Sequence, residues 1–441
     1  MYKSEEFKVQ QLGSCTIPSP LNLSKEIGDG IFNYIQDNER IVVDPNIRYY
    51  DECLKQGIEP LSFEKAGPRE FIYFDPSKTK AAIVTCGGLC PGLNNVIRGL
   101  VMQLNNRYGV KRIVGIKYGY EGFIPEYGHE IIDLLPEEIE NIHTQGGTIL
   151  GSSRGPQDIS KIVDALERMN INILFTIGGD GTLRGAQAIA SEITNRGLKI
   201  AVAGVPKTID NDINLIEKSF GFETAFTIAS EILLSAHNEA IGAYNGIALV
   251  KLMGRDSGFI AANATLAVQE VNYVLIPEIK FDLHGPQGFL EVLKKRLNEK
   301  HHALIVVAEG AGQNLFSKEK LEKDASGNVK FKDIGLYLKN EIKKEFKAQN
   351  IPFSIKYIDP SYIIRSAPAN ANDSLFCNIL AQNAVHAAMA GCTNFVVGYW
   401  NSQFTVLPIA ATVKNRKRIS GEDELWSNVI ETTGQPKILH N

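Results

Sequence analysis

Short apolar runs recur along the chain from residue 81 onward, and most are separated by segments long enough for a helix. Each run has the length of one strand buried on both faces, as in a parallel sheet. The runs span Ala81 to Cys86, Arg112 to Ile116, Ile173 to Ile177, Ile200 to Val205, Ile247 to Met253, Tyr273 to Ile276, Ala303 to Ala308 and Phe395 to Gly398. Because parallel strands need crossover connections, this alternation predicts an α/β fold of two doubly wound, Rossmann-like domains that face each other across a cleft.

Residues 1–78 follow a different pattern, with polar clusters, several prolines and only short apolar runs. We predict an N-terminal extension that wraps the core or mediates assembly. A chain of 441 residues is too long for one compact core, which agrees with two domains after the extension.

The composition is that of an ordinary globular protein, with 44% hydrophobic residues, 22% charged residues and a formal net charge of −4. This charge gives no electrostatic reason to expect nucleic acid or a membrane surface as a partner. No apolar run reaches the roughly 18 residues of a membrane span, and residues 1–10 are charged and lack the apolar region of a signal peptide. The six cysteines are scattered, as expected for free thiols in a reducing compartment. We therefore expect a cytoplasmic protein.

Two acidic clusters follow apolar runs directly: PKTIDND at residues 206–212 and GGDGT at residues 178–182. At the carboxyl ends of parallel strands, both would border one ligand crevice. Asp210 and Asp212 are two residues apart, so in an extended segment both point to one face and need a cation or a shared proton. A magnesium nucleotide and an acceptor hydroxyl would supply both, which indicates phosphoryl transfer; two solvated aspartates in a turn are the alternative.

The glycines of GGDGT would let a polyphosphate lie on the backbone while Asp180 reaches a magnesium ion, directly or through water. A capping aspartate at a helix start is the alternative. The loop CGGLCPGLNN, residues 86–95, also leads from a strand into a helix and would favour an oxyanion, unless it is a plain turn. Neither a P-loop signature nor a dinucleotide-binding fingerprint is present where it would be expected.

Arg154, Arg255 and Arg365 stand at the ends of other expected elements. A planar guanidinium group can clamp phosphoryl oxygens, whereas a single arginine near glycines is more often part of a surface ion pair. Three such arginines in a chain with both acidic clusters favour the clamp.

The motifs GGLCPGLNNVIRG, GSSRGP, GGDGT, PKTIDND, FGFETA, KLMGRDSGFIA and YIIR occur in this order. From about Tyr73 to Trp400 the chain resembles the 6-phosphofructokinase family, in particular its longer ATP-using branch from plants, kinetoplastids and spirochaetes, which is related to the pyrophosphate-using enzymes. The resemblance implies transfer of the γ-phosphoryl group of MgATP to the 1-hydroxyl of fructose 6-phosphate. It also implies a homo-oligomer, expected as a tetramer, because the family shares sites between subunits.

The resemblance implies catalytic roles at single positions. Asp210 would take the proton from the sugar hydroxyl, and Asp180 and Asp212 would serve the magnesium ion. Thr208 would contact the sugar or the moving phosphoryl group. The residues that would neutralise this group are Arg154 and Arg255.

Binding residues and domain roles follow from the same resemblance. The nucleotide phosphates would be held by Gly88, Arg154, Gly179, Asp180, Gly181, Thr182 and Lys207. The sugar phosphate pocket would contain Thr208, Asp210, Asp212, Met253, Gly254, Arg255, Glu309, Tyr362 and Arg365, with Lys356 where relatives place an arginine from the adjacent subunit. Residues 79–222, completed by a segment around 364–400, would form the nucleotide-binding domain. Residues 223–363 would bind fructose 6-phosphate, and residues 401–441 would form a C-terminal segment.

The choice of phosphoryl donor depends on two positions. In pyrophosphate-using relatives an aspartate at the position of Gly181 obstructs the space of the α-phosphate, so Gly181 favours ATP. Lys207 favours pyrophosphate, because the pyrophosphate users also carry lysine there. We weigh Gly181 more heavily, since a flexible lysine can move to meet the phosphates of ATP.

Three alternative functions stay open at this point. The first is a pyrophosphate-dependent phosphofructokinase. The second, a lipid or NAD kinase, would explain GGDGT but not PKTIDND followed by MGR. The third, a noncatalytic regulatory subunit, would be expected to lack the acidic pair.

Overall fold

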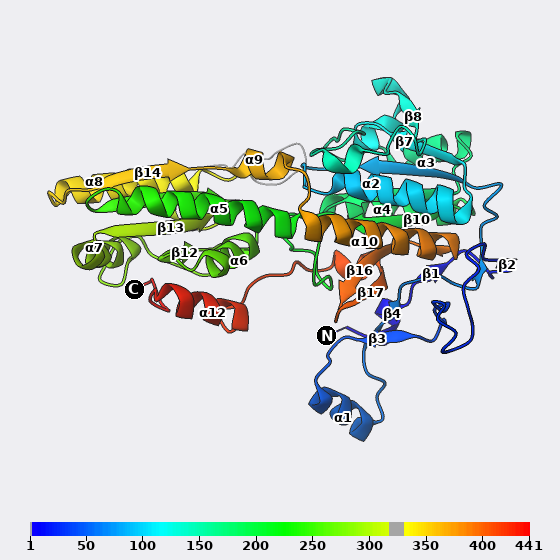
Figure 1. Ribbon diagram of the computed structural model, residues 1–441, viewed down its shortest axis with the longest axis horizontal. Helices are drawn as coiled ribbons and strands as arrows, with labels where there is room; N and C mark the ends of the chain where they lie inside the picture. The colour runs from blue at the N-terminus through cyan, green and yellow to red at the C-terminus, as the bar shows by residue number, and fades with distance from the viewer. Residues whose placement is uncertain (1, 317–329) are drawn as a thin grey trace. The chain divides into compact units, whose positions relative to one another are not determined.

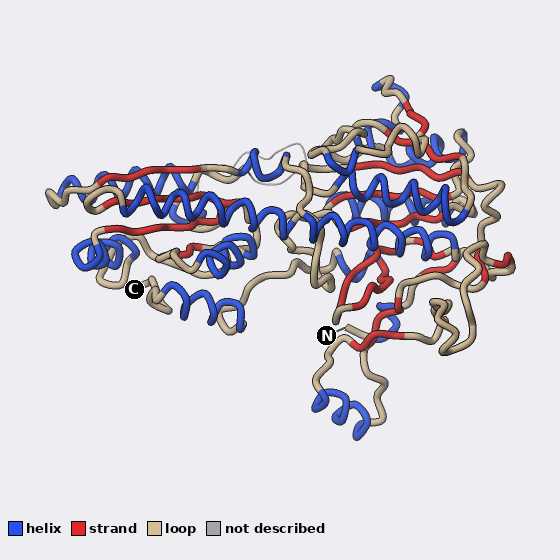
Figure 2. The backbone as a smooth tube through the Cα atoms, in the orientation of Figure 1, coloured by secondary structure: helices blue, strands red, loops and turns tan. Residues whose placement is uncertain are grey.

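The computed structural model describes residues 2–316 and 330–441, and the chain forms two compact units whose elements are drawn in Figure 1 and, by type, in Figure 2. Unit 1 comprises Met1–Ile209, Ile213–Gly221 and Ser366–Arg416. Unit 2 comprises Asp210–Asp212, Phe222–Arg365 and Lys417–Asn441. The predicted C-terminal segment 401–441 is therefore divided between them.

A nine-stranded sheet runs through the described part of unit 1. From edge to edge its strands are β3 (Arg40–Val42), β4 (Ser62–Lys65), β17 (Gln403–Pro408), β16 (Phe395–Trp400), β10 (Ala201–Pro206), β9 (Ile173–Gly178), β6 (Lys80–Thr85), β7 (Arg112–Ile116) and β8 (Ile131–Asp133). The central strands from β16 to β7 are parallel, and each coincides with a predicted apolar run.

The outer strands of this sheet are antiparallel, and they carry no continuous apolar run. Two of them, β3 and β4, come from the N-terminal residues and are only partly buried. The N-terminal residues also contain helix α1 (Ile47–Gln56) and the first members of two small pairs, β1 (Gln10–Gln11) with β15 (Cys392–Thr393) and β2 (Ile17–Pro18) with β5 (Phe71–Ile72). Strand β17 leads into α11 (Ile409–Thr412).

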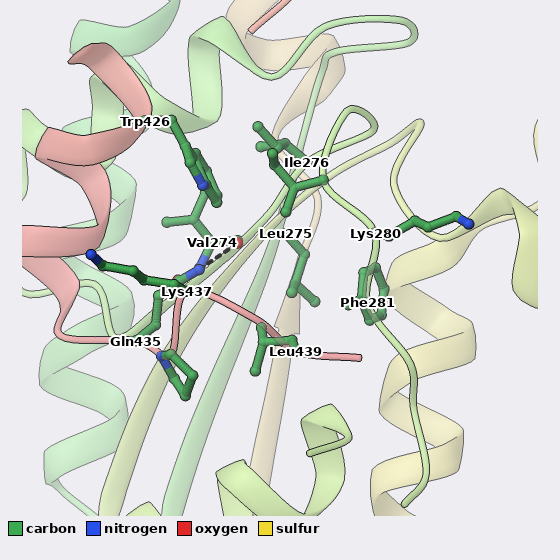
Figure 3. Close-up of a pocket in the computed structure, with 11 residues that line it drawn as sticks. Val274, Leu275, Ile276, Lys280, Phe281, Trp426, Gln435, Lys437 and Leu439 are labelled. Carbon is green, nitrogen blue, oxygen red and sulfur yellow. Dashed lines mark hydrogen bonds between the residues drawn. The ribbon is translucent and has the colours of Figure 1, made fainter. Parts of the chain in front are cut away.

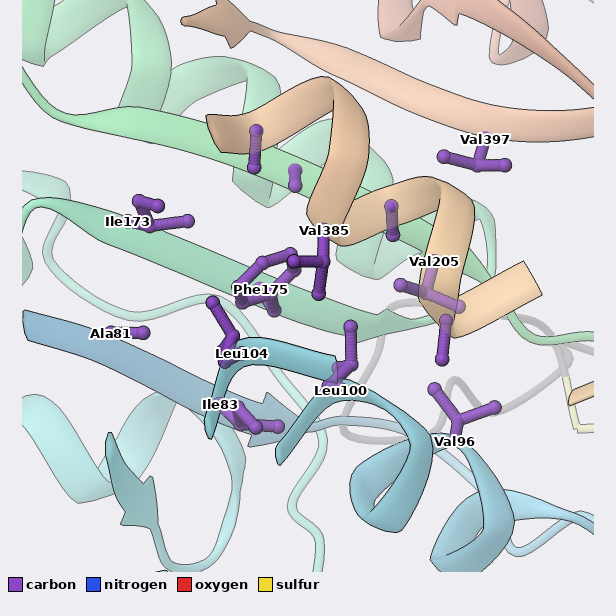
Figure 4. Packing of buried hydrophobic residues seen from close by; sticks show 14 of the residues in the cluster. Ala81, Ile83, Val96, Leu100, Leu104, Ile173, Phe175, Val205, Val385 and Val397 are labelled. Atoms are coloured by element: carbon purple, nitrogen blue, oxygen red, sulfur yellow. The ribbon is translucent and has the colours of Figure 1, made fainter. Parts of the chain in front are cut away.

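Helices cover both faces of the central sheet. On one face lie α2 (Leu93–Met102) and α10 (Ala371–Met389), and on the other α3 (Ile159–Arg168) and α4 (Asp180–Asn195). Val96 and Leu100 of α2 are buried in one cluster with Phe175 of the sheet and Val385 of α10 (Figure 4). The two helices approach closely at Gly99, where an added Cβ would lie 2.7 Å from the Cβ of Ala381.

The described part of unit 2 contains a four-stranded parallel sheet. Its order is β12 (Tyr273–Leu275), β13 (His302–Ala308), β11 (Gly246–Leu252) and β14 (Ser354–Ile358). The helices around it are α5 (Phe222–Ile241), α6 (Phe259–Val268), α7 (Phe289–Lys300) and α8 (Ile334–Ala348), with the short α9 (Ser361–Ser366) after β14. Ile247 and Leu249 pack with α7 and α8, whereas Ala248 and Val250 point to the opposite face and are equally buried. Both units thus confirm the predicted α/β class.

The last residues of the chain close one edge of this sheet. After α12 (Glu424–Thr433), the Gln435 side chain accepts a hydrogen bond from the Val274 N–H at 2.7 Å and donates to the Val274 carbonyl at 3.4 Å. Figure 3 shows this amide among the side chains of a small pocket, with Leu439 below it. β12 is the edge strand of the described sheet, and the Gln435 amide pairs with the Val274 backbone groups as a neighbouring strand would. The pocket contains none of the predicted site residues.

No helix in the two described ranges combines the length and the hydropathy that a membrane span requires.

Candidate active site

The ends of three strands of unit 1, β6, β9 and β10, lie together. The Lys207 Nζ, after β10, donates a hydrogen bond to the carbonyl oxygen of Gly88, after β6, at 2.9 Å. The Lys207 N–H donates to the Gly178 carbonyl at 3.0 Å, and a Cβ added to Gly179 would lie 3.2 Å from the Lys207 carbonyl oxygen. Predicted phosphate-binding residues from three separate motifs are therefore neighbours in the structure.

The GGDGT motif forms the junction between β9 and α4. The Thr182 side chain folds back over Gly178, where an added Cβ would lie 2.2 Å from the Thr182 Oγ1, so only glycine fits there. Asp180 is the first residue of α4, and Gly181 follows in its first turn. A Cβ added to Gly181 would meet no atom within 4 Å. The space into which a side chain at Gly181 would begin to extend is therefore open.

Two arginines that the motifs did not indicate flank Asp180. The Asp180 Oδ2 lies 3.1 Å from the Arg184 Nε and 3.9 Å from the Arg416 Nη2. Arg184 lies one helical turn further along α4, and it also donates to the Val413 carbonyl. The i, i+4 spacing could have indicated Arg184. Arg416 comes from a part of the chain without a motif, so no sequence signal pointed to it.

The loop that carries Arg154 packs against the first glycine loop. The Gly87 N–H donates to the Ser153 carbonyl at 3.0 Å, and the Ser152 hydroxyl donates to the Gly87 carbonyl at 2.6 Å. Arg154 itself is exposed. Thr208 also belongs to unit 1, and its carbonyl oxygen accepts a hydrogen bond from the Ser219 hydroxyl at 2.6 Å.

In unit 2, the carboxyl ends of β11 and β13 are joined by backbone hydrogen bonds. The Glu309 N–H donates to the Leu252 carbonyl at 2.9 Å, and the Gly310 N–H donates to the Gly254 carbonyl at 3.0 Å. Gly254 has a φ of +128°, and an added Cβ would lie 2.4 Å from the Ser257 carbonyl oxygen. This glycine turn places Met253, which is buried, and Arg255 beside Glu309.

Asp210 is also part of unit 2, and its carboxyl group interacts electrostatically with Glu309. Burial raises the pKa of Asp210 well above its usual range, and the charges of Asp212 and Glu309 raise it further, while a backbone hydrogen bond from Arg255 lowers it. Among the described residues, the buried Asp210 Oδ1 has no hydrogen-bond partner. A carboxylate in this state is a stronger base than an ordinary aspartate and can accept a proton at Oδ1.

Two of the predicted sugar phosphate residues, Arg255 and Arg365, lie close enough to Glu309 to affect its pKa. Burial raises the pKa of Glu309, and the positive charges of Arg255, Lys251 and Arg365 lower it. The Arg365 guanidinium lies 5.4 Å from the ring centre of Tyr362, which is an exposed residue of α9. The structure also places Lys356, on β14, with its Nζ 4.0 Å from Glu239, at an exposed position. Lys251 was not predicted.

The two predicted magnesium ligands are described in different units, Asp180 in unit 1 and Asp212 in unit 2. Among the described residues, no three acidic, histidine or cysteine side chains form a group that could hold a metal. Magnesium in proteins is usually held by one or two carboxylates together with water and substrate phosphates. Asp180 and Asp212 are carboxylates, the ligand type that such a site uses.

The phosphofructokinase family model matches residues 80–388. An ATP-dependent 6-phosphofructokinase from Borreliella burgdorferi is 50% identical over 442 residues, which cover 99% of this chain and 98% of that protein. The chloroplastic ATP-dependent 6-phosphofructokinase 5 of Arabidopsis thaliana is 47% identical over 415 residues, 92% of this chain and 76% of that protein.

Solved structures share the fold at lower sequence identity. The pyrophosphate-dependent phosphofructokinase of Marinobacter aquaeolei is 20% identical, with a TM-score of 0.66 over 80% of this chain and 91% of that chain. At this identity the likeness concerns the fold alone. The family match and the two closely similar relatives lead to one conclusion: the chain belongs to the phosphofructokinase family.

Proposed function

We infer that this protein is an ATP-dependent 6-phosphofructokinase, which transfers the γ-phosphoryl group of MgATP to the 1-hydroxyl of fructose 6-phosphate and yields fructose 1,6-bisphosphate. The observation that carries the choice of ATP is the open space at Gly181, where an added Cβ meets no atom within 4 Å. Relatives named as ATP-dependent enzymes, at 44–50% identity over nearly the whole chain, support the same donor.

The reaction proceeds by direct in-line displacement without a phosphoenzyme. Asp210 accepts the proton of the sugar hydroxyl, and its raised pKa makes it a stronger base than an ordinary aspartate. Arg154 and Arg255 neutralise the phosphoryl group in transit, and Thr208 contacts the sugar or this group. Catalysis consists mainly of positioning and charge neutralisation.

Unit 1 supplies the nucleotide site and unit 2 the sugar phosphate site. Gly88, Lys207 and the GGDGT loop hold the nucleotide phosphates. Glu309, Tyr362 and Arg365 bind the sugar phosphate together with Met253, Gly254 and the residues named above, and Lys356 serves the same pocket from an adjacent subunit.

Asp180 and Asp212 would hold Mg²⁺, which supplies charge neutralisation at the phosphate oxygens when bound. Asp180 is paired with Arg184 in the structure, at 3.1 Å, so magnesium would have to compete with this guanidinium group. We also propose a cytoplasmic location and a homotetramer.

A side-by-side donor assay tests the function. Purified protein is incubated with fructose 6-phosphate and Mg²⁺, with either ATP or pyrophosphate as donor, and formation of the bisphosphate is followed. ATP should support turnover, and pyrophosphate should give only a small fraction of that rate. A higher rate with pyrophosphate would favour the alternative that Lys207 suggests. Absence of turnover with both donors would overturn the proposal.

A further inference from the structure

Lys251 is a nearly buried lysine of β11 that bridges two carboxylates of unit 2. Its Nζ lies 2.8 Å from the Asp333 Oδ2 and 2.8 Å from the Asp359 Oδ2, and 12% of its side chain is exposed. Burial lowers the pKa of Lys251, but the hydrogen bonds to Asp333 and Asp359 outweigh this effect, so the net direction is upward. The lysine is therefore charged, and it holds two segments that are distant in the sequence.

Asp359 connects Lys251 to the helix that carries the predicted sugar phosphate residues. While its Oδ2 meets Lys251, its Oδ1 accepts hydrogen bonds from the Ser361 N–H at 3.2 Å and the Ser361 hydroxyl at 2.6 Å. The Ile364 N–H then donates to the Pro360 carbonyl at 3.0 Å, which forms the first turn of α9. One carboxylate thus joins β11 to the start of α9.

Asp333 makes the second connection. Its Oδ1 accepts a hydrogen bond from the Leu336 N–H at 2.9 Å at the start of α8, and the Tyr357 hydroxyl donates to the same oxygen at 3.0 Å. Tyr357 belongs to β14, the strand that leads to Asp359. Lys251 therefore fixes both the end of β14 and the turn that follows it.

The charge of Lys251 also affects the neighbouring pocket. Lys251 lowers the pKa of Glu309, whereas Asp359 raises it, so both act on a carboxyl group of the predicted pocket. Without the lysine, Asp333 and Asp359 would add negative charge beside a pocket that has to bind a phosphate group. Loss of the lysine would therefore oppose substrate binding through both geometry and charge.

We propose that Lys251 is a positioning residue of the sugar phosphate pocket: by holding Asp359 it sets the turn before α9 and thereby the places of Tyr362 and Arg365. This inference rests on the proposed function, because it assigns the pocket to fructose 6-phosphate. Lys251 does not itself touch the substrate.

The test compares three single variants with the parent in steady-state kinetics. Lys251→Met removes the charge and keeps the length, Lys251→Arg keeps the charge, and Lys65→Met is a matched control. Lys65 forms an ion pair of 2.9 Å with Glu39 in unit 1, whereas Tyr362 and Arg365 belong to unit 2. Lys251→Met should raise the KM for fructose 6-phosphate about 10- to 100-fold, since small misplacements in a site have effects of this size.

The other readouts separate positioning from general stability. The KM for ATP should change by less than about twofold in all variants, and Lys251→Arg should recover a large part of the sugar phosphate affinity. A purely structural role would reduce the folded fraction and hence the apparent kcat, but leave the KM for fructose 6-phosphate unchanged. That outcome, in a folded Lys251→Met protein, would overturn the proposal.

If Lys251→Met does not fold, Asp359→Asn takes its place as the test variant. It weakens the same ion pair with little change in volume and should raise the KM for fructose 6-phosphate in the same direction, by a smaller factor; an unchanged KM would again count against the proposal. A parent protein without turnover contradicts the proposed function, whereas an active parent with unchanged KM values in these variants contradicts only the role of Lys251.

Discussion

Asp210 carries a carboxyl oxygen that folding has removed from water, and the described residues supply no hydrogen-bond donor to it. Burial of this kind is unfavourable, but it raises the pKa of a group that must take up a proton. The charges of the neighbouring Asp212 and Glu309 raise the pKa of Asp210 further. Replacement by asparagine keeps the shape and removes the base. The Asp210→Asn variant should therefore lower kcat about 10²- to 10⁴-fold with little change in the KM for ATP, as measured by steady-state kinetics. Turnover close to that of the parent would refute the assignment as base.

Gly181 offers a test of donor choice that the fold should tolerate. It lies in the first turn of α4, where an added side chain meets open space and where a negative charge interacts favourably with the helix dipole. The Gly181→Asp variant should fold like the parent but lose at least about tenfold in kcat/KM for ATP, because like charges brought together in a binding site cost several kcal/mol. Gly181→Ala is the control and should keep most of the activity with ATP. Equal ATP kinetics in parent and aspartate variant would remove this position from the donor site.

Arg365 tests the sugar phosphate pocket directly. Its guanidinium group stacks on Tyr362 and lowers the pKa of Glu309, so it lies within the group of residues predicted to bind the phosphate. A charge-assisted contact contributes about 1.5–3 kcal/mol, so Arg365→Ala should raise the KM for fructose 6-phosphate about 10- to 150-fold. The KM for ATP serves as the internal control. An unaltered KM for the sugar phosphate would exclude Arg365 from the pocket.

At this scale the sequence indicates motif residues better than their partners. Gly181 and Asp210 could be singled out because they stand in motifs directly after apolar runs. Lys251 is the first residue of the KLMGRDSGFIA motif, but it looks there like any polar residue within a strand, and Arg416 stands outside every motif. Their contacts depend on segments far apart in the chain, such as Lys251 with Asp359, which no local pattern records.

Among the secondary-structure elements, the predicted strands are those buried on both faces. The central strands of both sheets coincide with apolar runs because helices cover their two sides. The edge strand β14 was missed, since its sequence, SIKYI, alternates apolar and polar residues and is only partly buried. β17 and the N-terminal β3 and β4 were missed as well, because antiparallel strands do not need a continuous apolar run.

The contact between α10 and the helical segment Gln103–Tyr108, which continues α2, predicts sensitivity to acid. The His386 Nδ1 lies 2.7 Å from the Tyr108 hydroxyl, and burial lowers the pKa of His386 to about 3, with Arg69 and Arg107 acting in the same direction. An unfolded histidine has a pKa of about 6.5. Between these values the unfolded chain binds a proton that the folded chain does not. The stability that neutral His386 contributes is therefore present above pH 6.5 and lost as the pH falls.

His386→Gln isolates this effect because glutamine keeps a polar partner for Tyr108 and does not titrate. Between about pH 7.5 and pH 5.5, the parent should lose about 1.4 kcal/mol more of its free energy of unfolding than the variant. Chemical denaturation at the two pH values measures the difference. An identical pH dependence in both proteins would show that His386 is protonated as easily in the folded state as in the unfolded one.

For the whole molecule, the testable property is assembly. We expect a homotetramer, with Lys356 serving the sugar phosphate pocket of a neighbouring subunit, since this side chain is exposed and its Nζ lies 4.0 Å from Glu239. Light scattering coupled to size-exclusion chromatography should give about four times the 48.6 kDa of one chain. Bovine serum albumin run on the same column provides the mass standard. A protein that is fully active as a monomer would contradict both the tetramer and the shared role of Lys356.

The course of the chain has a practical consequence for engineering. It passes from one unit to the other after residues 209, 212, 221, 365 and 416, and the shortest excursion, Asp210–Asp212, includes the predicted base. A cut at a single peptide bond therefore cannot separate the two units, because at least one of the two fragments always contains pieces of both. Swapping one unit between relatives would require several splice points at once, and the excursion at 210–212 would have to travel with the unit it packs in and not with its neighbours in the sequence.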